Sequence, residues 1–326
     1  MNGRTEKEIK TEKAVMEKLQ YYPQIVTDFY YDMKDSGKSF TTAKCYVEYV
    51  IHFILFVTGK TIKENFYKNI TTTDIKRYMN EIKTKKNDYG EIVEVGDEIR
   101  AVRWSAINLF FAFLKDNNYI DENPVEKTKR PRAKVEHQVT YLTKEEISQM
   151  LENVKLEAKP MFLNRDLSIF SLAITTGLRV SAICNINIRD VNFNENTISV
   201  IEKGHKRRKI PFGENLKEVL QAWLQDRKTY FKYIDTDALF VSQCKKRIST
   251  DMVRKMLKKY TEGVTTKHIT PHKLRASCAV AVYDQTKDIL LVAEMLGHEN
   301  IETTKRYTRA SDESKKQAVK FLDDLV

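Results

Sequence analysis

Residues 270–307 read TPHKLRASCAVAVYDQTKDILLVAEMLGHENIETTKRY, and three groups in this stretch decide how the rest of the chain is interpreted. They are the pair His272 and Arg275, then His298 within a Leu-Gly-His sequence, and then Tyr307 nine residues later. Arginine binds phosphate oxygens through a planar, permanently charged fork, and imidazoles titrate near neutral pH. A tyrosine phenol can act as the nucleophile that forms a covalent intermediate.

Two further groups lie upstream and extend the same pattern. The sequence TGLRVS at residues 176–181 supplies Arg179 at a helix start, and EKGHKRRK at residues 202–209 places Lys203 in a basic turn between two strand-like runs. A solvated basic hairpin is the plainer interpretation of Lys203. Taken together, two arginines, a lysine, two histidines and a tyrosine indicate a site for phosphodiester transesterification. A single tyrosine is most often a packing residue, which is the plainer interpretation of Tyr307. Its charged neighbours Lys305, Arg306 and Arg309 favour instead an exposed side chain that faces phosphate.

The bulk properties agree with a nucleic-acid partner. A length of 326 residues suits two domains, and 56 Lys and Arg residues against 45 Asp and Glu give a net charge of +11. Such an excess favours a polyanion, with nucleic acid first and an anionic membrane second. The most apolar run, residues 49–57, is too short to span a bilayer, and the N-terminus has no signal-peptide pattern. We therefore expect a cytoplasmic protein.

No cofactor is expected from the sequence. The four cysteines form no C-x-x-C pair, the six histidines form no H-E-x-x-H motif, and neither a P-loop nor a dinucleotide glycine motif is present. These observations exclude the common zinc, ATP and NAD signatures.

The spacing of apolar residues predicts a mainly helical protein in two domains. In the first half, helical periodicity covers residues 15–33, 40–57 and 99–115, and a helix capped near residues 71–74 runs to about 82. Residues 92–95 fit a short strand or a loop, and no strand pattern in this half is convincing. The first half is thus predicted to be a small helical bundle.

The second half is predicted to be mostly helical with one small antiparallel sheet. A capping box at residues 143–146 opens a helix to about 158, and helices are expected over 166–175, 178–185, 214–230, 250–260, 271–283, 288–296 and 301–308. Short strand-like runs at residues 191–193, 197–201 and 209–212 supply the sheet. Thr270 and Pro271 fit the N-cap and N1 positions of the helix that carries His272.

Between the two halves lies a proline-containing basic segment, which is either an exposed tether or a linker that crosses the DNA backbone. We divide the chain into a charged N-terminal arm over residues 1–14, a helical domain over 15–123, a basic linker over 124–137, a second domain over 138–313 and a tail helix over 314–326. The DNA-contacting candidates of the linker and the basic turn are Lys127, Lys129, Arg130, Arg132, Lys134, Lys206, Arg207 and Arg208.

The order and spacing of these groups resemble the tyrosine recombinases, also called the phage integrase family. That family carries an arginine in a T-G-L-R-x-S box, a lysine in a β-hairpin, H-x-x-R, L-G-H and a tyrosine nine residues later. The resemblance implies that the catalytic residues are Arg179, Lys203, His272, Arg275, His298 and Tyr307. It also implies a core-binding bundle of the SAM-like type and a catalytic domain, in the simpler Xer and transposon-integrase arrangement without an arm-binding domain.

The resemblance implies a mechanism and partners as well. Tyr307 would attack the scissile phosphate, the arginines would hold its non-bridging oxygens, and Lys203 would protonate the leaving 5′-oxygen, with Lys206 as the alternative. The partner would be a double-stranded DNA site bound by a dimer, with a tetramer in the synapse and the two domains clamping the duplex. The tail at 314–326 would dock on a neighbouring protomer or, in the plainer interpretation, on its own domain.

One departure from the family pattern stands at Ala182, where members usually have an acidic residue three positions after the first arginine. Its absence leaves open how Arg179 or the histidines are braced. Two other classes share these features: a type IB topoisomerase, which nicks and reseals one duplex, and a DNA-binding relative without activity. The Leu-Gly-His box, the compact helical first domain and the tail after Tyr307 favour the recombinase. The target DNA sequence and the direction of the reaction are not encoded in any motif.

Overall fold

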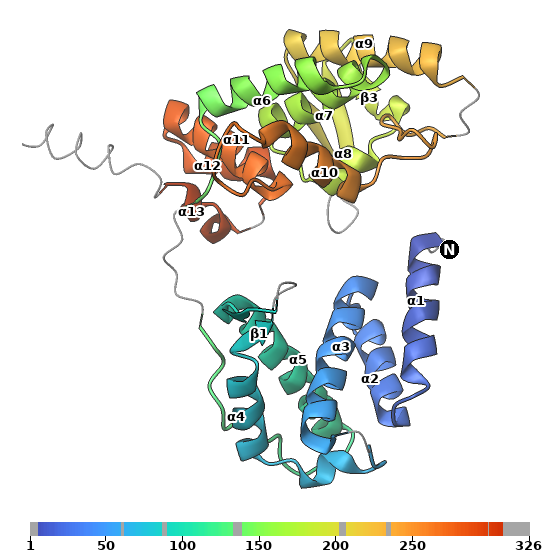
Figure 1. Cartoon of the computed structure of the whole chain (residues 1–326), viewed down its shortest axis with the longest axis vertical. Helices are drawn as coiled ribbons and strands as arrows, with labels where there is room; N and C mark the ends of the chain where they lie inside the picture. Colours follow the sequence, from blue (N-terminus) through green and yellow to red (C-terminus); the bar gives the residue numbers. More distant parts are fainter. Residues whose placement is uncertain are drawn as a thin grey trace, which may run out of the picture. The chain divides into compact units, whose positions relative to one another are not determined.

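The computed structural model describes residues 6–59, 62–86, 90–132, 139–201, 207–232, 236–298 and 300–308. The chain forms two compact units, residues 1–136 and 137–326, each with its own hydrophobic core (Figure 1). The prediction of a mainly helical protein with a small antiparallel sheet is confirmed.

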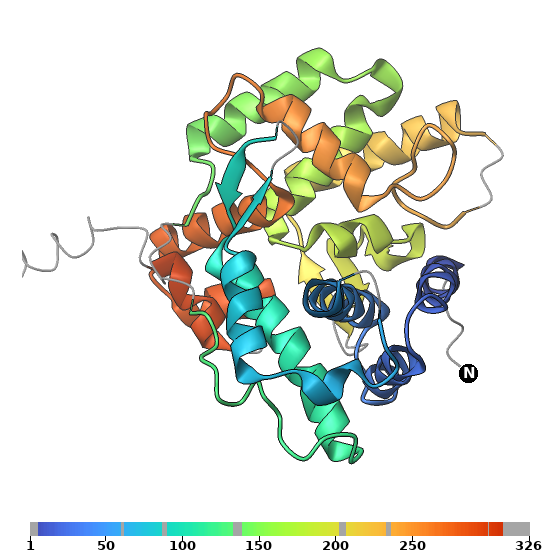
Figure 2. The same ribbon diagram turned by 60° about the horizontal axis from the view of Figure 1, so that its bottom comes forward.

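The first unit is a helical bundle with one short hairpin. Its elements are α1 (Glu6–Leu19), α2 (Gln24–Asp35), α3 (Phe40–Thr58), the 3-10 turn η1 (Phe66–Asn69), α4 (Thr72–Glu81), β1 (Thr84–Lys86), β2 (Ile92–Glu94) and α5 (Asp97–Asp116). Helix α3 packs against α2 and α5 (Figures 1 and 2). Among the described residues, α3 is the one helix that is long and apolar enough to cross a membrane, and Val50, Phe53 and Ile54 on it are buried in the bundle core.

Aromatic rings fill the core of this bundle. Phe29 of α2 meets Phe110 of α5 edge to face with ring centroids 5.2 Å apart, and Phe53 of α3 meets Tyr78 of α4 at 5.1 Å. Each such pair contributes about 0.5–1.5 kcal/mol beyond the burial of its area. The 3.6-residue periodicity of α3 and α5 therefore places one apolar face of each helix in a common core.

Four details of the first unit differ from the sequence prediction or extend it. Helix α1 already begins at Glu6, within the expected charged arm, and Pro23 separates α1 from α2 where one periodic stretch was expected. Strands β1 and β2 pair antiparallel with Thr84 opposite Glu94. Residues 92–95 fitted a strand or a loop and no partner strand was predicted, because three-residue strands are too short to show an alternating pattern. Of the expected linker, Val125 is fully buried in the bundle core.

The second unit holds the three-stranded sheet and most of the helices. Its elements are α6 (Lys144–Glu157), α7 (Pro160–Thr176), α8 (Val180–Asn185), η2 (Ile188–Asp190), β3 (Val191–Asn192), β4 (Thr197–Ile201), β5 (Arg207–Pro211), α9 (Glu214–Tyr230), α10 (Thr250–Thr261), α11 (Pro271–Thr286), α12 (Ile289–Leu296), η3 (Ile301–Thr303) and α13 (Lys305–Thr308). The strands run in the order β3-β4-β5, all antiparallel.

Helix α7 is the centre of the second unit, since it packs against α6, α9 and α11. Helices α12 and α13 both pack against α11, so the last described part of the chain gathers around one helix (Figure 2). The helix predicted over residues 301–308 is instead divided into η3 and α13 at Thr304. This gathering brings the His272, His298 and Tyr307 segments to one place.

Candidate active site

Helix α11 begins as its sequence predicts. Thr270 is the N-cap residue in an extended conformation, Pro271 occupies the first helical turn, and the Lys273 amide donates to the Thr270 carbonyl at 2.8 Å. His272 in that first turn is exposed, whereas Arg275, one turn further on, is only 2% exposed. The start of α11 therefore presents the imidazole to the surface and directs the guanidinium into the unit.

The buried guanidinium of Arg275 joins two distant segments. Its Nη1 donates to the Gly177 carbonyl at 2.8 Å, and its Nη2 donates to the Leu296 carbonyl at 2.6 Å. Gly177 lies two residues before Arg179, and Leu296 lies two residues before His298. A buried cation is tolerated when its N–H groups have acceptors, and here the acceptors belong to the other two motifs. Arg275 thus holds the T-G-L-R, H-x-x-R and L-G-H segments together.

Two glycines make this junction sterically feasible. Gly177 ends α7 with φ of 60°, and a Cβ at this position would lie 2.6 Å from Leu296 Cδ2 and 3.2 Å from Cys278 Sγ. Gly297 ends α12 in the same left-handed conformation, and the next amide, that of His298, donates to the Ala293 carbonyl at 2.9 Å. His298 therefore projects from a corner that the helix end fixes.

Arg179 is exposed at the N-cap of α8. Within the described part of the chain, its guanidinium has no hydrogen-bond or ion-pair partner, which leaves it available for a ligand. Ala182, at the position where the family usually has an acid, is partly buried and packs against the core of the second unit. The methyl group fills a place in the core and supplies no carboxylate to orient Arg179.

Tyr307 lies in the core, which corrects the expectation of an exposed side chain. It is 2% exposed and packs with Ala276, Ala279, Val280 and Leu296, although its neighbours Lys305 and Arg306 are exposed. The physical reason is that α13 is a single short turn, so consecutive residues point in different directions and one of them faces α11. Charged neighbours therefore do not predict the exposure of Tyr307.

His298 lies between Tyr307 and Thr304. Its ring is nearly parallel to the Tyr307 ring, with an interplanar angle of 19° and centroids 6.4 Å apart. Its Nδ1 lies 2.7 Å from the Thr304 hydroxyl oxygen. Thr304 is fully buried and was not predicted as a site residue; its position three residues before the tyrosine is the only signal in the sequence that could have drawn attention to it.

The site is strongly cationic, and this sets the protonation of its side chains. Desolvation and then the charges of Arg275, Arg179, Arg306 and the neighbouring His272 lower the pKa of His298 to about 4. Desolvation and the charges of Arg306, Arg275 and Arg179 likewise lower the pKa of His272 below 6.5. Both imidazoles are therefore neutral at pH 7 without DNA.

The pKa of the Tyr307 phenol is raised in this site, whereas those of the two histidines are lowered. Burial raises its pKa above 10, which outweighs the lowering by the charges of Arg306, Arg275 and Arg179. The phenol is therefore protonated at neutral pH, and a nucleophilic role requires a base that removes its proton.

The basic hairpin is described only in part. Lys203 and Lys206 lie outside the described residues, while the strands that flank them pair Ile201 with Arg207. Arg207 is exposed on β5. Nη1 of Arg208 donates to the carbonyls of Glu294 and Met295, at 3.1 and 2.8 Å, so the sheet is tied to the C-terminal end of α12. A contact of Arg208 with DNA stays a prediction. Its hydrogen bonds to the end of α12 were not foreseen from the sequence.

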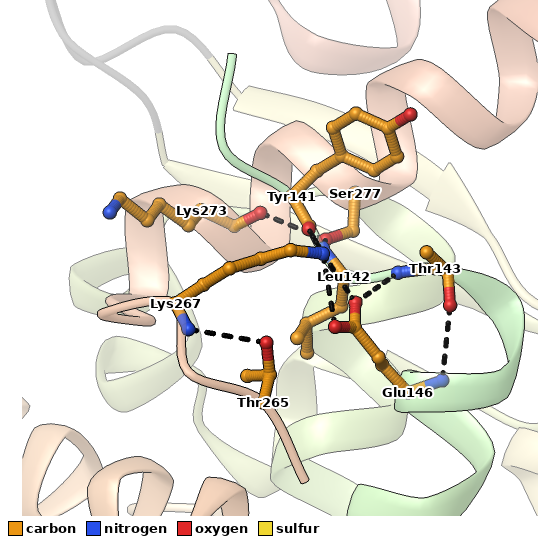
Figure 3. Close-up of polar contacts among 8 residues, drawn as sticks. All are labelled: Tyr141, Leu142, Thr143, Glu146, Thr265, Lys267, Lys273 and Ser277. Carbon is orange, nitrogen blue, oxygen red and sulfur yellow. Dashed lines mark hydrogen bonds and ion pairs between the residues drawn. The ribbon is translucent and has the colours of Figure 1, made fainter. Parts of the chain in front are cut away.

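A polar network attaches the first residues of the second unit to α11 (Figure 3). Lys267 Nζ donates to the Tyr141 carbonyl at 3.1 Å and to both oxygens of Glu146, at 3.0 and 2.8 Å. The buried Ser277 hydroxyl accepts from the Leu142 amide at 2.8 Å and donates to the Lys273 carbonyl. The segment that follows the linker is therefore fixed to the helix that carries His272 and Arg275.

The basic segment of the first unit starts against the bundle. Thr128 accepts a hydrogen bond from Trp104 Nε1 at 2.7 Å, and Lys127 forms an ion pair with Glu122 at 2.6 Å. Lys129, Arg130 and Arg132 are exposed and line an open pocket of about 1070 Å³ beside α5. Lys134 lies outside the described residues. Lys127 is therefore paired with an acid, whereas Lys129, Arg130 and Arg132 line the pocket.

Comparison with known proteins identifies the family. Residues 140–314, more than half of the chain, match the phage integrase family. The tyrosine recombinase XerC of Caldanaerobacter subterraneus subsp. tengcongensis is 30% identical over 322 residues, which cover 94% of this chain and 89% of that protein. XerC of Vibrio vulnificus is 36% identical over 209 residues, 64% of this chain and 65% of that relative. The chain belongs to the phage integrase family, that of the tyrosine recombinases.

Solved structures agree with the fold. The XerA recombinase is 26% identical, with a TM-score of 0.50 over 90% of this chain and 97% of that one. XerH bound to its difH substrate before cleavage gives a TM-score of 0.65 at 21% identity, covering 86% of this chain and 79% of that one. A lambda integrase dimer bound to a COC′ core site gives a TM-score of 0.66 at 19% identity, covering 89% of this chain and 95% of that one. The last two likenesses concern the fold alone.

Proposed function

We propose that this protein is a site-specific recombinase that cuts and rejoins double-stranded DNA through a 3′-phosphotyrosine intermediate on Tyr307, and that it acts in the cytoplasm. Integration, excision and resolution of a mobile element or replicon all use this chemistry. The observation that carries the proposal is the pair of hydrogen bonds from Arg275 to the carbonyls of Gly177 and Leu296. They join Arg179, Arg275 and His298 in one cationic cluster, and Tyr307 packs against the same helix.

In the first step the Tyr307 oxygen attacks the scissile phosphorus, and the bond from phosphorus to the 5′-oxygen breaks. The products are a 3′-phosphotyrosine and a free 5′-hydroxyl. The phenol proton must leave, and His272 is the proposed base because its lowered pKa keeps the imidazole neutral and able to accept a proton at pH 7. Lys203 is the proposed acid that protonates the departing oxygen.

Negative charge grows on the non-bridging oxygens as the phosphorus becomes five-coordinate. Arg179 and Arg275 are the proposed binding groups for these oxygens, and His298 is the proposed hydrogen-bond donor. Removing one preorganised donor of this kind costs about 3–4 kcal/mol of barrier, or roughly a hundred- to a thousandfold in rate. No nucleotide cofactor is needed, because each step exchanges one phosphate ester for another.

In the second step the 5′-hydroxyl of a partner strand attacks the phosphotyrosine and releases the Tyr307 oxygen. Strand exchange therefore requires two sites brought together. Lambda integrase has been solved as a dimer on a core site and as a tetramer on a Holliday junction. We extend this assembly to the present chain: a dimer on each DNA site and a tetramer in the synapse.

The test is covalent trapping on DNA. A binding site is first selected from a random duplex library, and a nicked suicide form of it is then incubated with the protein. Wild type should form an adduct that resists denaturation, and Tyr307→Phe should bind the site and form none. Because the substitution removes only one oxygen from a packed ring, the fold should persist. Tyr283→Phe, in a partly buried ring that packs against the same cluster, is the matched control and should retain the adduct.

Three outcomes would overturn the proposal. An undiminished adduct with Tyr307→Phe would move the nucleophile elsewhere, and binding without any wild-type adduct would favour a DNA-binding relative. Relaxation of supercoiled DNA by one protomer, with no exchange between two sites, would identify a topoisomerase instead.

A further inference from the structure

Thr304 occupies the turn between η3 and α13 and touches both His298 and Tyr307. Its hydroxyl oxygen lies 2.7 Å from His298 Nδ1, and its carbonyl accepts the Tyr307 amide at 2.9 Å. Its own amide donates to the Ile301 carbonyl at 2.8 Å, and the residue is fully buried. One residue therefore contacts the imidazole through its side chain and the tyrosine through its backbone.

The direction of the hydrogen bond between Thr304 and His298 follows from what the hydroxyl can donate to. A buried hydroxyl proton without an acceptor costs on the order of 1–3 kcal/mol. Within the described residues, His298 Nδ1 is the only side-chain or backbone partner of this hydroxyl oxygen. The Thr304 hydroxyl is therefore the donor of this hydrogen bond, and His298 Nδ1 is the acceptor. An imidazole that accepts at Nδ1 is neutral and carries its hydrogen on Nε2.

We propose that Thr304 is a positioning residue that holds His298 as the neutral tautomer with hydrogen on Nε2, so that this N–H points toward the reacting phosphate. The inference rests on the proposed function, since it assigns how His298 becomes a donor in that reaction. The other tautomer would place a lone pair, and no hydrogen, on Nε2. Such an imidazole would repel the phosphate oxygens.

The groups around the ring support a neutral donor. The cations Arg275, Arg179 and Arg306 and the second imidazole His272 all act on His298, and the Tyr307 ring lies beside it. A proton on Nδ1 would add a positive charge to this cluster and would force the Thr304 hydroxyl to give up its acceptor. Both effects disfavour the imidazolium. A neutral Nε2–H donor avoids both.

The direct test measures the tautomer in DNA-free protein. Nitrogen NMR of histidine-labelled wild type, with the His298 signals assigned through His298→Gln, should show an imidazole protonated on Nε2 at pH 7. Thr304→Val replaces the hydroxyl with a methyl group of similar size and should give a mixture of tautomers, whereas Thr304→Ser should retain the wild-type signal. An Nδ1–H tautomer in wild type would overturn the proposal, whether or not any variant folds.

The functional test follows single-turnover adduct formation on the selected nicked site. Loss of the partner that orients a metal-bound histidine typically costs roughly tenfold to a hundredfold, and we expect a loss of similar size here. Thr304→Val should show such a loss with unchanged site affinity, and Thr304→Ser should recover most of the rate. Thr303→Val is the matched control, since Thr303 is exposed and its hydroxyl donates to Asn300. An undiminished rate in Thr304→Val would contradict a positioning role.

Failure of this inference is distinguishable from failure of the proposed function. If wild type forms no adduct on any selected site, the recombinase assignment fails, while the NMR measurement still decides the tautomer. If wild type forms the adduct but the tautomer is the other one, only the role of Thr304 falls.

Discussion

Arginine residues at positions 179 and 275 carry the same charge but have different surroundings. Arg275 is buried with two carbonyl acceptors, and Arg179 is exposed at the start of α8. A guanidinium can bridge two carbonyls because its N–H groups lie in one plane and point in different directions. A lysine ammonium group does not have this geometry. The two arginines proposed to bind one phosphate therefore make different contributions to the stability of the fold.

This difference gives a prediction for alanine variants. Arg275→Ala leaves two buried carbonyls without donors, at about 1–3 kcal/mol each, so the free energy of unfolding should fall by roughly 2–6 kcal/mol. Arg179→Ala should change it by no more than about 0.5 kcal/mol, as for other surface substitutions. Both should reduce adduct formation by roughly a hundredfold or more. Urea unfolding and single-turnover trapping measure the two effects; equal losses of stability would contradict the assignment of separate roles.

At this scale the sequence allowed the motif residues to be predicted but not their exposure. The five described motif residues, Arg179, His272, Arg275, His298 and Tyr307, were singled out from their sequence pattern and its resemblance to the family, and their catalytic roles stay predictions. Burial of Tyr307 was not predicted, because exposure in a one-turn helix depends on which side faces α11. Thr304 was missed for a related reason: a threonine in a polar stretch has no distinctive pattern until the turn places its hydroxyl on an imidazole.

Among the secondary-structure elements, those with strong local signals were predicted closely. The capping box at Thr143 starts α6, and α9 runs over the expected residues Glu214–Tyr230. Local hydrogen bonds and periodicity determine such elements, so a single sequence is sufficient. Strand β1 and the break at Thr304 were missed, and β2 was given only as a strand or a loop over residues 92–95. Three-residue strands and a single 3-10 turn depend on tertiary contacts that no local pattern records.

The turn between α7 and α8 is the element on which the site depends most. Gly177 combines a positive φ, a close approach to Leu296 and Cys278, and the carbonyl that accepts from Arg275. A Cβ at this position would lie 2.6 Å from the end of the Leu296 side chain and 3.2 Å from Cys278 Sγ, so these side chains of α12 and α11 would have to shift. Leu296 also supplies the second carbonyl acceptor of Arg275, so stability and catalysis are linked at this position.

We therefore predict that Gly177→Ala lowers both stability and cleavage. Gly263→Ala is the matched control, because Gly263 has a φ of 73° but a Cβ at this position would have no other atom within 4 Å. The control incurs only the cost of the left-handed conformation, about 1 kcal/mol, whereas Gly177→Ala adds overpacking of about 1–3 kcal/mol. Thermal and urea unfolding compare the two. Equal destabilisation would show that the close approach to Leu296 is relieved without cost.

The charge of the whole molecule points to DNA, but its distribution over the described residues is uneven. Many lysines form ion pairs with nearby acids, as Lys115 does with Glu126 and Lys127 with Glu122. The exposed cations Lys129, Arg130 and Arg132 gather instead around the pocket beside α5. The net charge of +11 could be calculated from composition, whereas the difference between paired and clustered cations required the structure.

This distribution predicts which cations contribute to DNA affinity. Each phosphate neutralised by a protein cation adds about 0.9 to the slope of log affinity against log salt concentration. Replacing Lys129, Arg130 and Arg132 with glutamine should therefore flatten the slope by up to about 0.9 for each phosphate that these side chains neutralise, on the selected site and on unrelated duplexes alike. Lys127→Gln should have a smaller effect, since Glu122 already neutralises part of its charge.

The control for this experiment removes the same number of charges elsewhere. Lys115, Lys155 and Lys287 each lie within an ion pair with Glu126, Glu152 and Asp284, respectively. Their triple glutamine variant has the same net charge as the test variant, so a general loss of attraction would flatten both slopes equally. A larger change in the test variant would locate phosphate binding at the basic segment. Equal slopes would mean that the segment only tethers the two units and that the DNA surface lies elsewhere.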